Sequence, residues 1–273
     1  MENFKDKVVV ITGGATGIGY SFAKKFGQEG AKIVIAGRRQ NRNEEAVARL
    51  KNLGIEATAF PCDVTDRKSV EELADQSWEK YGHVDVIVNN AGNMVQSKSV
   101  IDSTGEDFQK GFAVNVYGMV NGCSVFGKRM IEQGTPAAIY NIGSENSFFH
   151  GVPFAAPYVA SKHAALAISE SLREETPDFI EVSHICPGFV KSELGDEASM
   201  QLAMDTDKYT SIAMEQIKEG KFYVVSHAYN MKRIDDRYKE VKEAFDKYAP
   251  RYEGDEEHDV RTLMQKLMEA EGK

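Results

Sequence analysis

The sequence predicts an α/β protein in which one doubly wound parallel sheet of about seven strands is followed by a helical C-terminal extension. Three observations lead to this prediction. Short apolar runs alternate with longer helical segments through most of the 273 residues, a spacing typical of parallel βαβ units. A glycine-rich turn follows the first apolar run, and beyond residue 230 the composition changes abruptly to charged residues.

The apolar runs are too short for helices, so we expect them to be buried strands. They cover residues 7–12, 32–36, 57–60, 84–89, 137–142, 180–185 and 222–225. The expected helices end near residues 29 and 53 and cover 66–81, 106–131 and 158–175. Glycines at 111, 118, 122 and 127 weaken the 106–131 helix, which indicates either close packing against another helix or a local kink.

The charged C-terminal part predicts two amphipathic helices, roughly residues 235–248 and 255–269, separated at Pro250. We see no internal repeat and no low-complexity linker. We therefore expect one domain over residues 1–229 and a charged helical extension over residues 230–273.

Charge and composition limit the partners. The net charge of −9 argues against nucleic acid or an anionic membrane as the main partner, and no apolar run is long enough to span a bilayer. Cys62, Cys123 and Cys186 are far apart and form no CxxC pair, so they are expected to be reduced thiols. The polar N-terminus passes straight into a strand without a signal peptide. The expectation is a cytoplasmic protein with no metal site.

Gly13, Gly17 and Gly19 lie between the first strand and the first helix, where a tight turn favours residues without a Cβ. The helix N-terminus there offers free N–H groups to a pyrophosphate. The spacing G-x3-G-x-G differs from the commoner G-x-G-x-x-G pattern. A glycine-rich turn without a ligand is the alternative, but its place directly after the first strand favours dinucleotide binding.

Tyr158 and Lys162 are four residues apart, so they share one face of the expected helix. A free Tyr has a pKa of roughly 10, and a cationic neighbour favours its phenolate form. Such a pair can act as a general acid/base.

Four motifs in this order extend the argument: Thr12-Gly13-Gly14-Ala15-Thr16-Gly17-Ile18-Gly19, Asn89-Asn90-Ala91-Gly92, Tyr158-Val159-Ala160-Ser161-Lys162 and Pro187-Gly188. Together they resemble the short-chain dehydrogenase/reductase superfamily over roughly residues 5–225. The resemblance implies a single-domain Rossmann-type fold and hydride transfer to or from a carbon that bears oxygen. It also implies a mobile substrate lid at about residues 193–218.

The resemblance implies four catalytic residues. Tyr158 matches the acid/base, and Lys162 matches the residue that lowers the Tyr pKa and binds the nicotinamide ribose. Ser144 matches the serine that hydrogen-bonds the substrate oxygen, with Ser147 as the fallback, and Asn115 matches the asparagine that holds a water in the proton relay. The chemistry agrees, because a ketone that gains hydride develops alkoxide character and needs a donor and a proton source at its oxygen.

The cofactor set implied by the resemblance is Gly13, Thr16, Gly17, Ile18, Gly19, Arg38, Arg39, Asp63, Val64, Asn90, Ala91, Gly92, Tyr158, Lys162, Pro187, Gly188, Val190 and Ser192. NAD-binding folds usually place an acid at the end of the second strand, but here Gly37 is followed by two arginines. A guanidinium fits a 2′-phosphate, so NADP(H) is predicted over NAD(H), with Arg38 as the main contact. A solvated loop residue is the alternative for Arg39, and a helix cap is the alternative for Asp63.

The candidate substrate residues flank the catalytic ones in sequence: Ser144, Phe149, His150, Phe154 and Phe189. They predict an apolar pocket for a bulky ketone or secondary alcohol such as a hydroxysteroid, although aromatic residues in such loops are also commonly core. A 3-oxoacyl or sugar substrate, or a cofactor-binding regulatory protein, are the alternatives. The C-terminus lacks the Asp-Gly-Gly sequence that many family members use in tetramer contacts, so both a homodimer and a homotetramer are left open.

Overall fold

Seven parallel strands form one sheet in the computed structural model, which describes residues 1–95, 98–195, 197–249 and 251–270. The strands are β1 (Val8–Thr12), β2 (Lys32–Gly37), β3 (Ala57–Pro61), β4 (Val86–Asn89), β5 (Ala137–Ile142), β6 (Ile180–Cys186) and β7 (Tyr223–Val225). Their order is β3-β2-β1-β4-β5-β6-β7, and every neighbouring pair is parallel. The predicted doubly wound α/β fold is confirmed.

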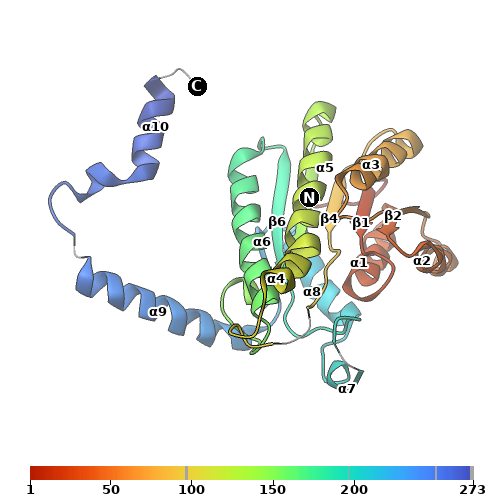
Figure 1. Ribbon diagram of the computed structural model, residues 1–273. Coiled ribbons are helices and arrows are strands. Elements are labelled where there is room, and N and C mark those ends of the chain that lie inside the picture. The colour runs from red at the N-terminus through yellow and green to blue at the C-terminus, as the bar shows by residue number, and fades with distance from the viewer. Residues whose placement is uncertain (96–97, 196, 250, 271–273) are drawn as a thin grey trace. The chain divides into compact units, whose positions relative to one another are not determined.

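Helices cover both faces of this sheet (Figure 1). One layer contains α1 (Gly17–Gln28), α2 (Gln40–Asn52) and α8 (Thr206–Lys218), and the other contains α3 (Arg67–Tyr81), α5 (Met119–Gln133) and α6 (Ala156–Glu175). Along β1, Val9 and Ile11 pack into the first layer, whereas Val8 and Val10 pack into the second. Burial on both faces explains why the strands are continuous apolar runs rather than alternating ones.

The helix expected over residues 106–131 is interrupted. The structure has α4 (Gly105–Phe112), a π-helical turn (Ala113–Gly118) and then α5. A Cβ at Gly118 would lie 2.6 Å from the Val64 side chain, and a Cβ at Gly122 would collide with Asn89. These two glycines therefore let the helix approach a loop and strand β4. A Cβ at Gly111 would lie 3.4 Å from Pro157 O, so at that glycine the expected close packing against another helix, α6, is confirmed. The π-turn accounts for the irregularity.

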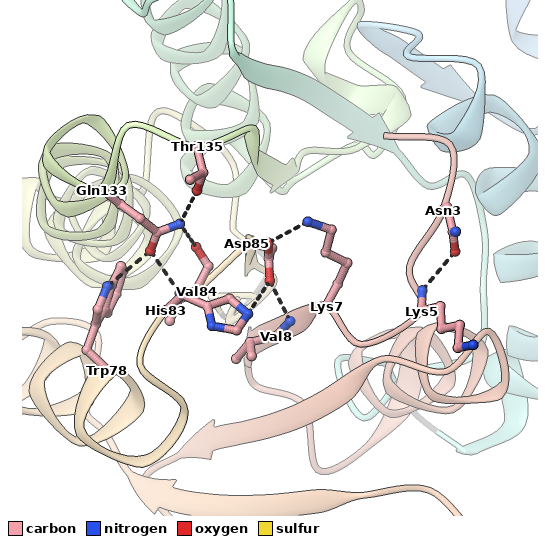
Figure 2. Close-up of polar contacts among 10 residues, drawn as sticks. All are labelled: Asn3, Lys5, Lys7, Val8, Trp78, His83, Val84, Asp85, Gln133 and Thr135. Atoms are coloured by element: carbon pink, nitrogen blue, oxygen red, sulfur yellow. Dashed lines mark hydrogen bonds and ion pairs between the residues drawn. The ribbon is translucent and has the colours of Figure 1, made fainter.

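At the amino-terminal end of the sheet, the buried carboxylate of Asp85 accepts from two donors and lies beside the ring of His83 (Figure 2). Lys7 Nζ donates to Oδ1 at 2.8 Å, and the Val8 backbone N–H donates to Oδ2 at 2.8 Å. His83 Nε2 lies 3.2 Å from Oδ2. Because Asp85 precedes β4 and Val8 begins β1, this carboxylate ties the two central strands together.

The side chain of Gln133 makes a second set of contacts beside it (Figure 2). Its Oε1 accepts from Trp78 Nε1 and from the Val84 backbone N–H, each at 3.1 Å. Its Nε2 donates to Val84 O at 3.3 Å and to Thr135 Oγ1 at 2.7 Å. The end of α5 is thereby attached to α3 and to the start of β4.

The chain divides into two compact units, Met1–Ala228 and Tyr229–Lys273. The second contains α9 (Met231–Tyr248), a 3-10 turn (Asp255–His258) and α10 (Val260–Ala270). Helix α9 begins four residues before the expected 235, and the second expected helix is split into the turn and α10. The predicted separator, Pro250, lies outside the described residues. None of the described helices is long and apolar enough to cross a membrane.

Candidate active site

A cavity of about 710 Å³ opens at the carboxyl ends of the central strands, where ligands bind in open α/β sheets. Every residue of the predicted cofactor set lines this cavity. Of the four predicted catalytic residues, Ser144, Tyr158 and Lys162 line it and Asn115 does not. The structure thus brings together, from the segments that follow six of the strands and from helix α6, the residues that the sequence motifs selected.

The glycine-rich turn between β1 and α1 is shaped to approach a ligand. Gly13 and Gly17 have positive φ angles of 63° and 55°, which residues with a Cβ rarely adopt. A Cβ at Gly19 would collide with the Asn90 side chain, whose Nδ2 donates to Thr12 O at 2.8 Å. Thr16, which precedes α1, makes no side-chain hydrogen bond to the first turn. The N–H groups of that turn therefore remain available, and the cradle fits a pyrophosphate.

Three arginines line the cavity beyond β2. Arg38 and Arg39 are joined there by Arg42, which is not among the predicted cofactor residues. Arg42 lies in the first turn of α2, and the available signal was its closeness in sequence to the Arg38–Arg39 pair. Arg39 Nη2 lies 2.8 Å from Glu193 Oε2, and this hydrogen bond and charge hold the Glu193 pKa below its ordinary value.

Asp63 lines the same end of the cavity but is engaged locally. Its Oδ1 accepts from the Thr65 backbone N–H at 3.0 Å and from Thr65 Oγ1 at 2.8 Å. The cap of helix α3 is Asp66, which accepts from the Lys68 N–H. The helix-cap alternative for Asp63 is therefore wrong, although one of its two carboxylate oxygens is held within its own turn.

Tyr158 and Lys162 lie one turn apart on α6, with Lys162 Nζ 5.7 Å from the centre of the Tyr158 ring. Lys162 Nζ donates to Ile142 O at 3.0 Å, and burial lowers the Lys162 pKa to about 8. Burial raises the Tyr158 pKa, the charge of Glu145 raises it further, and a hydrogen bond with Ser144 opposes them. This differs from the expected lowering by Lys162, because desolvation of the phenolate outweighs the neighbouring charge.

Ser144 and Ser147 have different surroundings. Both are buried, but only Ser144 lines the cavity. Ser147 Oγ lies 3.0 Å from Nε2 of His184, which is completely buried. The geometry therefore favours Ser144 over its fallback as the residue that faces a ligand.

Asn115 lies in the π-helical turn and is 2% exposed. Its Oδ1 accepts from the Asn93 backbone N–H at 2.8 Å, and its Nδ2 donates to Asn93 O and to Ser161 Oγ, each at 3.0 Å. Asn115 thus joins the loop after β4 to helix α6. Its role in a proton relay stays a prediction.

Only some of the aromatic residues predicted for the substrate pocket lie at the cavity. Phe189 lines the cavity, but Phe149, His150 and Phe154 do not. Phe149 is buried at 4% exposure, while Phe154 is 63% exposed and its backbone carbonyl accepts from the Lys98 N–H at 2.7 Å. His150 is exposed. Closeness in sequence to Tyr158 did not determine which way these loop side chains point.

Other apolar residues line the cavity that the aromatic candidates were expected to form. They are Met94, Val95, Val114, Val152, Leu194 and Met200. The part of the predicted lid that reaches the cavity includes Glu193 and Met200, whereas Tyr209 and Ile217 of α8 are fully buried in the core. No motif marks these apolar positions, which come from loops and short helical segments far apart in sequence.

Comparison with known proteins identifies the family. The family model described as short chain dehydrogenase matches residues 7–203. A C alpha-dehydrogenase from Sphingobium sp. (strain NBRC 103272 / SYK-6) is 35% identical over 204 residues, covering 74% of this chain and 67% of the relative. A 1-deoxy-11-beta-hydroxypentalenate dehydrogenase from Streptomyces arenae is 30% identical, covering 86% and 87%.

Among solved structures, a short chain dehydrogenase/reductase from Burkholderia phymatum in complex with NAD superposes with a TM-score of 0.81. It is 28% identical, and the match covers 89% of this chain and 96% of that one. The family match, the relatives and the shared fold agree with the arrangement of the cavity. The chain therefore belongs to the short chain dehydrogenase family and is an enzyme of the dehydrogenase class.

Proposed function

We propose that this protein is an NADP(H)-dependent oxidoreductase that interconverts a ketone and a secondary alcohol on a bulky, largely apolar substrate. One observation carries the proposal. A single cavity has Tyr158, Ser144 and Lys162 in one part of its wall, and the glycine cradle and three arginines in another.

The residues present fit a nicotinamide dinucleotide phosphate. The Gly13–Gly19 turn would hold the pyrophosphate, Arg38 and Arg42 would hold the adenosine 2′-phosphate, and Lys162 would bind the nicotinamide ribose. When bound, the cofactor supplies or accepts the hydride. The absence of an acid at the end of β2, where Gly37 stands, supports NADP(H) over NAD(H).

Tyr158 would supply the proton. Its phenol O–H can donate to the oxygen of a ketone as hydride is added, and burial, which raises the Tyr158 pKa, favours this protonated form. Ser144 would donate a hydrogen bond to the same oxygen as its negative charge develops. Lys162, with a pKa of about 8, can return a proton to Tyr158 at little cost.

The apolar lining supports a bulky carbocyclic substrate such as a hydroxysteroid. Met94, Val95, Phe189 and Met200 offer hydrophobic contact, while Ser144 and Tyr158 would fix the reacting oxygen. The similarity to a dehydrogenase named for a hydroxypentalenate is in keeping with this class of alcohol.

Substitution of Tyr158 tests the proposal. We expect Tyr158→Phe to lower the turnover of NADPH with an alicyclic ketone by about 10³-fold, because the proton donor is lost, while NADPH binding measured by fluorescence stays within about threefold. Tyr117→Phe, at a residue that is 58% exposed, is the matched control and should keep full activity. Turnover that survives in Tyr158→Phe would refute the assignment, and loss of binding together with turnover would indicate a structural role.

The cofactor preference has its own test. We expect Arg38→Ala to raise the KM for NADPH by about 10- to 100-fold, because a hydrogen bond to a charged group contributes about 1.5–3 kcal/mol, and to leave the KM for NADH nearly unchanged. Arg67→Ala, on α3, is the control. Equal losses with both coenzymes would rule out a 2′-phosphate contact.

A further inference from the structure

The orientation of the Asn146 side-chain amide is determined by its surroundings. Asn146 lies in the 3-10 turn Glu145–Ser147, is 4% exposed and lines the cavity. Its Oδ1 accepts from the Gly151 backbone N–H at 2.9 Å. A backbone N–H can only donate, so the atom facing it must be the oxygen and the other end of the amide must be the NH₂ group.

That NH₂ group points at Ser144. Nδ2 of Asn146 donates to Ser144 Oγ at 3.3 Å, and the Asn146 backbone N–H donates to the same oxygen at 3.1 Å. A hydroxyl oxygen has two acceptor positions and one proton. With both acceptor positions filled, Ser144 can interact with a third group only as a donor, and Tyr158 is its hydrogen-bond partner in the cavity.

We propose that Asn146 is a positioning residue that occupies the Ser144 hydroxyl as an acceptor, so that the hydroxyl can only donate toward the reacting oxygen. The inference rests on the proposed function, in which Ser144 hydrogen-bonds the substrate oxygen. If Ser144 could accept, the Tyr158 proton would be drawn to Ser144, and only the Ser144 proton would remain for the substrate oxygen. Asn146 therefore reserves both protons for the oxygen on which charge develops.

The backbone of this turn is held independently of the Asn146 side chain. The Ser144 N–H donates to Ser147 Oγ at 3.3 Å, and Ser147 Oγ lies 3.0 Å from His184 Nε2. Pro187 O also accepts from the Glu145 N–H at 2.8 Å. A change confined to the Asn146 amide should alter the direction of the hydrogen bonds without moving Ser144.

The isosteric change Asn146→Asp tests the direction of the bond. A carboxylate still accepts from the Gly151 N–H, but it presents an acceptor to Ser144 and takes the Ser144 proton. We expect kcat to fall by about 100-fold at pH 7.5, the cost of losing one oxyanion donor, with the KM for ketone within about threefold. Asn146→Ala, which only empties one acceptor position, should lose about 10-fold or less.

The ranking of these two variants separates positioning from packing. If Asn146 only filled space and anchored Gly151, the isostere Asp would be tolerated better than Ala. Activity of Asn146→Asp equal to or above that of Asn146→Ala would overturn the inference. A deficit in Asn146→Asp that narrows at pH 5, where the new carboxyl gains a proton and can donate again, supports it.

A double-mutant cycle with Ser144→Ala excludes a simple charge effect on Tyr158. If Asn146 acts through Ser144, Ser144→Ala/Asn146→Asp should be no slower than Ser144→Ala alone. If the double variant is about 100-fold slower than Ser144→Ala, the added charge acts on Tyr158 and only this inference fails. If Ser144→Ala retains full kcat, the proposed role of Ser144 fails and the inference fails with it. Thermal unfolding and NADPH fluorescence confirm that each variant is folded and binds cofactor.

Discussion

Strand β4 is anchored at both ends by buried polar side chains, yet the two ends use different chemistry. At the amino end, the charged carboxylate of Asp85 accepts from Lys7 and Val8 and contacts the ring of His83 (Figure 2). At the carboxyl end, next to the cavity, Asn89 begins a chain of neutral groups. One end is a charged hub, and the other is an uncharged relay of hydrogen bonds.

The neutral chain runs across four elements, β4, β5, α6 and β6. Asn89 Nδ2 donates to Asn141 Oδ1 at 2.8 Å, and Asn141 Nδ2 donates to Ser169 Oγ at 3.1 Å. Ser169 Oγ donates to Ala165 O and lies 3.0 Å from His184 Nδ1. This pattern places the imidazole proton on Nδ1 of His184 and leaves Nε2 to accept from Ser147.

The difference shows how the fold holds the catalytic loop without placing a further charge beside the catalytic residues. Burial and the Lys162 ammonium lower the His184 pKa to about 3, so the imidazole is neutral where a second cation would compete with Lys162. The loop that carries Ser144 is therefore held rigidly without an added charge near Tyr158. At the amino end no reaction constrains the choice, and a buried carboxylate holds the strands.

Removal of the charged hub should give the largest change in stability and leave catalysis intact. Asp85 is 3% exposed, and Asp85→Ala leaves the Val8 N–H and the Lys7 ammonium without their acceptor. We expect a loss of about 3 kcal/mol in the free energy of unfolding, measured in urea, with kcat within about twofold. Asp75→Ala, whose carboxylate is 67% exposed beside Arg129, is the matched control and should lose less than about 1 kcal/mol. A fall in kcat for folded Asp85→Ala would contradict the separation of the two ends.

The neutral imidazole of His184, at the carboxyl end of the sheet, should make the protein less stable in acid. Because the folded pKa of His184, about 3, lies below the ordinary 6.5, the unfolded chain binds more protons between these values. Stability is therefore lost as pH falls from 6.5 toward 3, by about 1.4 kcal/mol per pH unit. His184→Gln should remove this component. The fall in the free energy of unfolding between pH 7 and pH 4.5, measured in urea, should therefore be about 2–3 kcal/mol smaller in His184→Gln than in the unaltered protein. The control is His258→Gln, at an exposed position. Equal pH dependence in His184→Gln and the unaltered protein would contradict a buried neutral imidazole.

The sequence predicted the framework well because its signals are local. Each strand is a short apolar run, and the glycines at 13, 17 and 19 mark the turn that forms the cradle. Motifs placed Ser144, Tyr158 and Lys162 at one cavity because each follows a strand end or starts a helix at a fixed point in the fold. Such features need no knowledge of contacts between distant residues.

What could not be predicted depends on distant contacts. Asp85 meets Lys7, and His184 meets Ser147, across separations that no spacing rule records. Phe154 was expected at the substrate pocket and is instead largely exposed, because a loop side chain follows backbone geometry that adjacency does not encode. The raised Tyr158 pKa likewise reflects burial, which the Tyr–Lys spacing alone cannot give.

The smallest effect on catalysis is expected from the C-terminal unit. The apolar core clusters of the first unit contain no described residue beyond Val224, whereas Tyr238, Val241, Phe245 and Tyr248 of α9 are exposed at spacings of three and four residues. Ending the chain at Asn230 should therefore leave kcat with an alicyclic ketone within about twofold and change the melting temperature by less than about 2 °C, since no described member of the core clusters is removed. The full chain carrying Phe245→Glu, which retains α9 but adds charge to its apolar stripe, should behave in the same way. If the truncated chain loses turnover while Phe245→Glu keeps it, the unit completes the active site through residues outside that stripe. Loss of turnover in both variants would instead show that the exposed apolar face of α9 is needed for catalysis.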